Sequence, residues 1–176
     1  MKYKILLLNF FISILTFAQN ESKEKDVFNV ARSGTVEEIK VIESKIPESI
    51  NSVNASGFTP LILACYRGNL PVAEYLMTQV NNINYVSPSG TALAAVIVKG
   101  DKNLAQKLLE NKADPNLADS NGTTPLIFAV QFQNKDLVKM LLEFKADKSI
   151  ADKNGKTPFE HAVFSQNKEI IELLKN

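Results

Sequence analysis

A few side chains in the sequence are of the types that catalyse reactions or bind metals. His161 is the only histidine and Cys65 the only cysteine among the 176 residues. Imidazole acid–base chemistry would therefore depend on His161, and thiol chemistry on Cys65. Carboxylates that could pair as a catalytic or metal-binding couple are found at Asp114, Asp119, Asp147 and Asp152.

The sequence repeats itself at a period close to 33 residues. Residues 57–65 read GFTPLILAC, residues 122–130 read GTTPLIFAV and residues 155–163 read GKTPFEHAV. A threonine recurs with separations of 32, 33 and 33 positions, at Thr59, Thr91, Thr124 and Thr157. A period in this range is typical of solenoid proteins, whose units stack on their neighbours.

The repeat register indicates structural roles for the candidate catalytic residues, because it aligns them with apolar or turn residues of the other units. His161 falls where the other units have leucine, alanine and phenylalanine, and Cys65 falls where they have isoleucine and valine. The four aspartates form two pairs, each one repeat apart, as duplicated turn residues would. Phosphate-loop, metal-ligand and nucleophile-elbow motifs are absent. We predict no catalytic residues, no metal site and no cofactor, and an enzyme that uses His161 or Cys65 is the less favoured alternative.

Each unit is predicted to contain two short helices. Threonine followed by proline is a helix start, because the hydroxyl caps a free amide and proline needs no partner for its nitrogen. Glu160, three residues after Thr157, completes a capping box. Apolar residues at spacings of three and four share one helix face. These residues are Leu61, Ala64, Cys65, Leu93, Val96, Ile97, Leu126, Ala129, Val130, Phe159, Ala162 and Val163.

Helix ends and turns follow from glycine and small polar residues. We expect the first helix of a unit to end at a left-handed glycine, at Gly34, Gly68 and Gly100. Gln133 and Gln166 replace this glycine, so Asn134 or Asn167 is expected to take the left-handed conformation. Asp, Asn or Ser in first place and Gly in fourth predicts type I turns at residues 54–57, 87–90, 119–122 and 152–155. The third unit lacks one residue before Thr91, which predicts a shorter loop.

These motifs together resemble the ankyrin-repeat family. The resemblance covers residues 26–176 and implies an all-α solenoid of five stacked helix-turn-helix units with projecting turn or β-hairpin loops. The segment DVFNVARSGTVEEIKVI resembles the N-terminal capping repeat of such arrays. The implied units are residues 26–53 (N-terminal cap), 54–86, 87–118, 119–151 and 152–176 (C-terminal cap). The family often has histidine in the fourth place of its TPLH motif, which is Ile62, Ala94, Ile127 or Glu160 here, so we expect that histidine's hydrogen bond to be absent.

The N-terminus predicts export. Residues 1–18 carry two early lysines, an apolar run and a small-residue end, as a signal peptide does, and residues 19–25 are expected to be a disordered linker. A retained anchor is the alternative, but the run from Ile5 to Ala18 is 14 residues, whereas a spanning helix needs about 20. We expect a protein in the periplasm or outside the cell, without membrane insertion after cleavage and without an intramolecular disulfide.

The charge balance argues against nucleic acid as a partner. Cleavage removes two of the 20 basic residues and none of the 19 acidic ones, which leaves a net charge of −1 with histidine neutral. Nucleic-acid binding proteins normally carry a clustered basic excess. We therefore expect no nucleic acid among its partners.

What remains is a surface for another protein. In the family that the chain resembles, inner helix ends and turn tips line a concave partner-binding face, and aromatic side chains are favoured anchors. Phe58, Tyr66, Val98, Phe132 and Phe164 would form an exposed apolar stripe there. The predicted partner-binding residues are Phe58, Tyr66, Arg67, Ser89, Val98, Lys99, Asn121, Gln131, Phe132, Lys153, Asn154 and Phe164.

The sequence thus predicts a monomeric, non-enzymatic protein-binding module. It would act as a scaffold, a stabiliser, or an inhibitor or immunity factor that covers a partner's active surface. A self-associating structural protein of the cell envelope is the alternative from another class.

Overall fold

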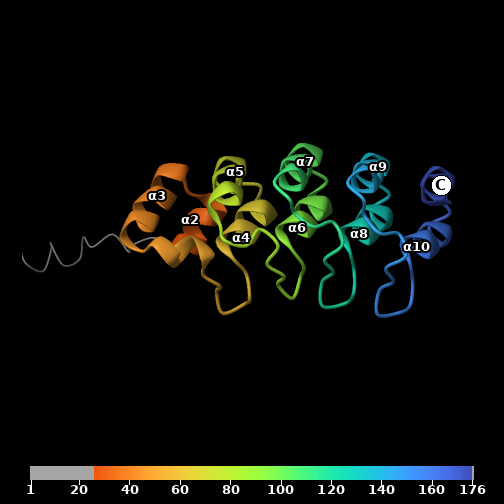
Figure 1. Ribbon diagram of the computed structural model, residues 1–176, viewed down its shortest axis with the longest axis horizontal. Coiled ribbons are helices and arrows are strands. Elements are labelled where there is room, and N and C mark those ends of the chain that lie inside the picture. The colour runs from red at the N-terminus through yellow and green to blue at the C-terminus, as the bar shows by residue number, and fades with distance from the viewer. Residues whose placement is uncertain (1–25, 176) are drawn as a thin grey trace, which may run out of the picture.

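The computed structural model describes residues 26–175, which form an array of paired helices (Figure 1). Helix labels are those of Figure 1 and begin with α2. The helices are α2 (Val27–Ser33), α3 (Val36–Lys45), the 3-10 helix η1 (Pro47–Asn51), α4 (Pro60–Arg67), α5 (Leu70–Gln79), α6 (Ala92–Lys99), α7 (Lys102–Glu110), α8 (Pro125–Gln131), α9 (Lys135–Glu143), α10 (Pro158–Phe164) and α11 (Lys168–Lys175).

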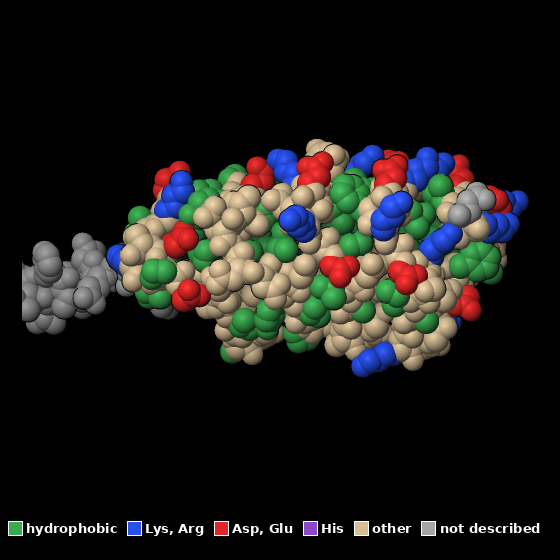
Figure 2. Space-filling model, in the orientation of Figure 1, with side chains coloured by type: hydrophobic (Ala, Val, Ile, Leu, Met, Phe, Trp, Pro, Cys, Tyr) green, Lys and Arg blue, Asp and Glu red, His purple; other side chains and the backbone are tan. Residues whose placement is uncertain are grey.

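The helices lie in two rows. The inner row is α2, α4, α6, α8 and α10, in which successive helices contact one another. The outer row is α3, α5, α7, α9 and α11. Each outer helix packs against the inner helix of its own unit. The turns project from the side opposite the outer row (Figure 1). Charged side chains are most frequent over the outer helices (Figure 2).

One apolar core runs along the whole array. Leucines from both rows are almost fully buried, and the cluster is continuous from the first described unit to the last. Within residues 26–175 no strand forms, and the one β-type contact found is an isolated bridge between Ser87 and Gly90. The predicted all-α solenoid of helix-turn-helix units is confirmed.

The inner helices begin as predicted. The hydroxyls of Thr59, Thr91, Thr124 and Thr157 each accept a hydrogen bond from the amide three residues later, at 3.2 to 3.4 Å. Glu160 completes the capping box by accepting from the Thr157 amide at 2.6 Å. A second capping box joins Thr35 and Glu38 at the start of α3. The Thr-x-x-Glu spacing that produces it was visible in the sequence.

The inner helices end partly as predicted. Gly68 and Gly100 are left-handed, with φ of 72° and 74°. Gly34 is not: its φ of −92° is extended. A side chain is excluded there by space instead, because a Cβ would lie 2.6 Å from both Val30 and Glu38.

The glutamine positions correct a second expectation. Gln133 and Gln166 themselves are left-handed, with φ of 53° and 55°. Asn134 has a φ of −87° and caps the following helix by accepting from the Leu137 amide. Asn167 likewise accepts from the Ile170 amide. Because the asparagines are needed as N-caps, the residue before each must make the left-handed bend.

The turns have the predicted form. In each, the fourth-place glycine donates its amide to the carbonyl of the first residue, at 2.9 to 3.0 Å. In three turns a second bond closes the loop four residues on, as between the Asp119 amide and the Thr123 carbonyl. In the third unit the Ser87 amide bonds to Gly90, three residues on. The shorter loop predicted for this unit is confirmed.

An asparagine ladder joins the units and was missed from the sequence. The side-chain carbonyls of Asn51, Asn84 and Asn116 accept from the backbone amides of residues 81, 114 and 147 in the next unit, at 2.7 to 2.8 Å. These asparagines recur at the repeat period, which was the available signal. The ladder adds hydrogen bonds between side chains and backbone to the packing contacts that join successive units.

Val163 corrects the predicted apolar face. It was expected to be buried like its equivalents, but its side chain is 49% exposed. Within the described residues no further unit packs on that side of α10. Burial at this place therefore depends on a unit packed on that side of the inner helix, as it does for Val130.

The N-terminal predictions concern other residues. The predicted signal peptide (residues 1–18) and linker (residues 19–25) lie outside the described residues. Within residues 26–175 every helix is too short or too polar to cross a membrane.

Candidate protein-binding groove

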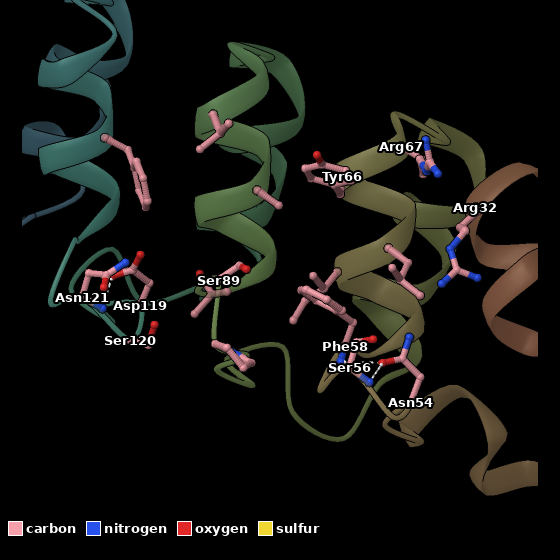
Figure 3. Close-up of a pocket in the computed structure, with 17 residues that line it drawn as sticks. Arg32, Asn54, Ser56, Phe58, Tyr66, Arg67, Ser89, Asp119, Ser120 and Asn121 are labelled. Carbon is pink, nitrogen blue, oxygen red and sulfur yellow. Dashed lines mark hydrogen bonds between the residues drawn. The ribbon is translucent and has the colours of Figure 1, made fainter.

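A hollow of about 680 Å³ lies between the inner helices and the turn tips of the first four units (Figure 3). We call it the groove. Its lining residues come from α2, α4, α6 and α8 and from three turns. They are Arg32, Asn54, Ser56, Phe58, Ile62, Leu63, Tyr66, Arg67, Pro88, Ser89, Thr91, Ala95, Val98, Asp119, Ser120, Asn121 and Phe128.

The floor of the groove is apolar and repeats with the units. Leu63, Ala95 and Phe128 occupy the same place in three successive inner helices and pack against the core. Above them, Tyr66 is 51% exposed and Val98 is 37% exposed. Exposed apolar groups beside a hollow are typical of contact sites.

The opposite wall is polar and held by the turns. The Asn54 side-chain oxygen accepts from the amides of Ser56 and Phe58, at 2.9 and 3.0 Å. Asp119 accepts from the amides of residues 121 and 123, both at 2.8 Å. Neighbouring turn tips are bonded to each other through the Ser120 amide and the Pro88 carbonyl, at 3.1 Å. The wall is therefore preformed, which lowers the entropic cost of binding.

Half of the predicted partner-binding residues meet in the groove. Those that line it are Phe58, Tyr66, Arg67, Ser89, Val98 and Asn121. Phe58 differs from the prediction in one respect, since it is half-buried and packs against the core rather than standing free. The groove thus joins predicted residues from three units.

The other half lies outside the groove lining. These residues are Lys99, Gln131, Phe132, Lys153, Asn154 and Phe164, and all are exposed. The Lys99 ammonium lies 5.0 Å from the centre of the Tyr66 ring, so it borders the groove. Phe164 is 82% exposed, with the Lys156 ammonium 5.1 Å from its ring.

The lining residues outside the predicted set include Leu63, Ala95, Phe128 and Arg32. Leu63, Ala95 and Phe128 share the place of His161, so the repeat register already grouped them. Arg32 stands two residues before Gly34, as Tyr66 stands two before Gly68. That alignment was the signal that could have placed Arg32 in the groove.

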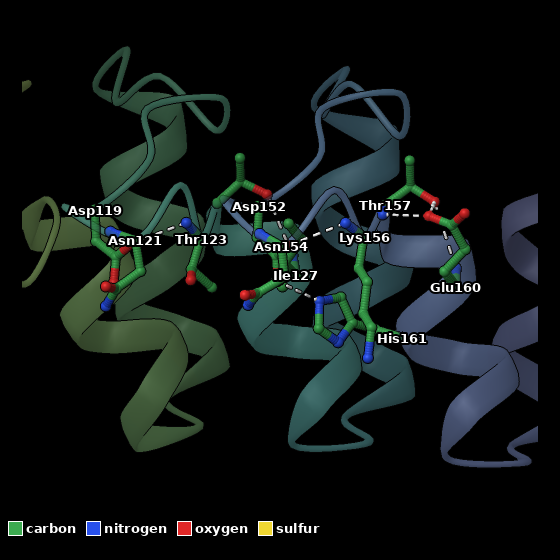
Figure 4. Close-up of polar contacts among 11 residues, drawn as sticks. Asp119, Asn121, Thr123, Ile127, Asp152, Asn154, Lys156, Thr157, Glu160 and His161 are labelled. Carbon is green, nitrogen blue, oxygen red and sulfur yellow. Dashed lines mark hydrogen bonds and ion pairs between the residues drawn. The ribbon is translucent and has the colours of Figure 1, made fainter.

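His161 forms a structural contact in the last unit. Its Nε2 lies 2.9 Å from Asp152 Oδ2, and both side chains are mostly buried (Figure 4). The other Asp152 oxygen accepts from the amides of Asn154 and Lys156. The Lys156 amide first, and His161 in addition, hold the Asp152 pKa below its ordinary value.

The last unit does contain a histidine contact, but it is not formed from the fourth place of the motif. Glu160 stands in the histidine place of the motif, and the contact comes from the next residue, His161. It ties the start of α10 to the preceding turn. Since both partners are engaged with each other and with the turn, the arrangement supports a structural role.

Cys65 lies in the core. Its side chain is 1% exposed, and burial, with a smaller contribution from Asp101, raises the thiol pKa to about 12. Thiolate is the reactive form, so the thiol is poorly suited to nucleophilic chemistry. Among residues 26–175 no cluster of three or more His, Cys, Asp or Glu side chains is arranged to hold a metal ion.

Comparison with known proteins identifies the architecture. The family model for ankyrin repeats in three copies matches residues 27–119 and 92–176. The ankyrin repeat and SAM domain-containing protein 6 of Rattus norvegicus is 32% identical over 106 residues, which are 59% of this chain and 12% of the relative. The protein of the same name from Mus musculus is 31% identical over 106 residues, with the same shares of each chain. The chain thus spans a small part of these relatives.

The match extends over nearly all of the described residues. Ankyrin repeats are generally non-enzymatic interaction domains that bind other proteins. The chain belongs to the ankyrin-repeat family.

Proposed function

We propose that the chain is a non-enzymatic module that binds a partner protein in the groove. The observation that carries this proposal is the preformed hollow of about 680 Å³, with exposed Tyr66 and Val98 above an apolar floor. A partner side chain could bury apolar area there without a change in the backbone of the array. An interface of standard size covers about 800 Å² on each partner, which is larger than the groove alone.

The remaining contact area would come from the C-terminal units. Lys99, Gln131 and Phe132 follow the groove along the inner helix ends, and Lys153, Asn154 and Phe164 continue the same places of the repeat. Phe132 is 56% exposed, which supports its assignment as an anchor. The proposed surface thus extends from the second unit to the last.

We place the function outside the cytoplasm. Cleavage of residues 1–18 would release the chain to the periplasm or the cell exterior, where it would act as a monomer. There it would be a scaffold, a stabiliser, or an inhibitor or immunity factor for its partner. Fractionation of the cell that makes the protein, with the mass of the recovered chain, tests both the compartment and the cleavage.

Site-specific photo-crosslinking tests the groove directly. A photoreactive phenylalanine analogue replaces Ser89, an exposed groove residue, in one form of the full chain. It replaces Gln106, exposed on the outer helix α7, in the control. We expect an adduct of defined mass from position 89 and none from position 106. Equal adducts from both positions would remove the groove from the proposal.

Paired substitutions then test the anchors. Because Tyr66 and Phe132 are exposed, Tyr66→Ser with Phe132→Ser should leave the unfolding midpoint unchanged and weaken partner binding by about tenfold or more. Val41→Ser, at a side chain that is similarly exposed on the outer helix α3, is the matched control. Partner binding that survives in the groove variant contradicts the anchor assignment.

The photo-crosslinking experiment also distinguishes the alternative function, self-association. A self-associating structural protein would give an adduct of twice the mass of the chain. It would also show concentration-dependent oligomers in sedimentation.

A further inference from the structure

The groove holds both arginines of the protein. The chain contains 20 basic residues, of which Arg32 and Arg67 alone are arginine. They come from the neighbouring inner helices α2 and α4, and both line the groove at the same end (Figure 3). The lysines are spread over the rest of the chain.

A role at the helix ends does not explain the choice of arginine. Both residues lie in the last turn of their helix, where any cation favours the helix dipole. Lys99 occupies the last turn of α6 and serves there equally well. What arginine adds is a planar fork of N–H donors that binds a carboxylate through two parallel hydrogen bonds.

The two guanidinium groups keep most of their donors free. Arg32 donates through Nη1 to the side-chain oxygen of Asn29 at 3.0 Å. Among residues 26–175 the Arg67 guanidinium forms no hydrogen bond or ion pair. Asp119, the acid of the groove lining, already accepts two turn amides through one oxygen. Within residues 26–175 neither guanidinium forms an ion pair, so both can bind an incoming carboxylate.

We propose that the groove binds an extended acidic segment of the partner protein. Aspartate or glutamate side chains of that segment bind Arg32 and Arg67 by two-point hydrogen bonds. An adjacent apolar side chain lies against Tyr66 and Val98, with Lys99 adding positive charge at the border. This inference rests on the proposed function and names the chemistry of the partner.

The test uses the full chain and a displayed library of random peptides about twelve residues long, enough to span a groove of this kind in extended form. We expect the enriched peptides to carry two or more acidic residues beside an apolar one. The leading peptide, labelled for fluorescence anisotropy, is compared with a copy in which glutamine and asparagine replace its acids. The acidic peptide should bind about tenfold more tightly, and its affinity should fall as salt is raised.

Substitutions in the protein test whether the two arginines bind the acidic peptide. Arg67→Gln should weaken the acidic peptide by about tenfold, and Arg67→Lys, which keeps the charge but loses the fork, should still weaken it. Arg32→Lys is expected to act in the same direction. Lys102→Gln on the outer helix α7 removes a charge away from the groove and should leave binding unchanged. Because Arg67 and Lys102 are both exposed, loss of folding does not confound the comparison.

Other outcomes overturn the inference. Enriched peptides without acids, or an acidic peptide indifferent to the arginine variants, would exclude carboxylate recognition. If these peptides still lost affinity in Tyr66→Ser, the proposed protein-binding function would stand. Displacement by inorganic phosphate as effective as by the peptide would indicate a simple anion site. No enriched peptide at all would exclude an extended segment, and the photo-adduct at position 89 would then decide the proposed function separately.

Discussion

The fourth unit and the last unit share the repeat motif but have different surroundings. Residues 122–130 read GTTPLIFAV and residues 155–163 read GKTPFEHAV. Both form a capped inner helix after a four-residue turn. Yet Val130 is 0% exposed and Val163 is 49% exposed. The local pattern determines the helix and the turn, whereas burial depends on the presence of the next unit.

The turns show the same contrast, and glycine substitution should give the largest effect. Gly122 and Gly155 have φ of 78° and 74°, so alanine is strained at both. At Gly122 an added Cβ would also lie 2.9 Å from the Lys153 amide nitrogen, while at Gly155 it meets nothing within 4 Å. We expect Gly122→Ala to lower the free energy of unfolding by about 3 kcal/mol. Gly155→Ala should cost about 1 kcal/mol.

Urea unfolding followed by circular dichroism measures both variants. The difference between them isolates the contact between neighbouring turns, in which the Lys153 amide donates to the Asn121 carbonyl at 2.9 Å. Equal losses of stability would mean that the turns tolerate separation. The helix packing and the asparagine ladder would then hold the units together.

The two valines give the next largest effect. Val130→Ala removes buried methyl groups and leaves a cavity between α8 and its neighbours, so we expect a loss of about 2 kcal/mol in the free energy of unfolding. Val163→Ala removes the same atoms from an exposed site and should change stability by less than about 0.5 kcal/mol. The same denaturation measurement applies. A large loss at Val163 would show that something covers this face in solution.

Much of the fold could be predicted because its determinants are local. A threonine cap and its amide partner are three residues apart, and a turn closes within four, so Thr59 or Gly68 can be interpreted from the neighbouring sequence. Gln133 could not be interpreted in this way. Its left-handed bend arises because Asn134 is occupied by the next helix, which is a competition between two roles.

The candidate site was less predictable because it is built from separate units. The repeat register grouped Tyr66 and Val98 at the inner helix ends, and both side chains line the groove. It did not reveal that Phe58 folds back onto the core, since this depends on the shape of the neighbouring surface. Arg32 was missed because the first unit lacks the Thr-Pro-Leu start that sets the register.

The smallest effect concerns the place that Phe128 and His161 share. Phe128 lines the groove, whereas His161 bonds to Asp152, whose pKa is lowered by the Lys156 amide and by His161. A lowered folded-state pKa means that the contribution of Asp152 to folding stability is present above the unfolded pKa of about 3.9 and is lost as the pH falls through the folded value.

His161→Phe should raise the Asp152 pKa while leaving it below normal, because the Lys156 amide remains. NMR titration of the Asp152 carboxyl measures this, with Asp147, held low by Ser149, as the internal control. An unchanged Asp152 pKa would mean that the turn amides alone set it, and that the histidine only fills the space that phenylalanine fills one unit earlier.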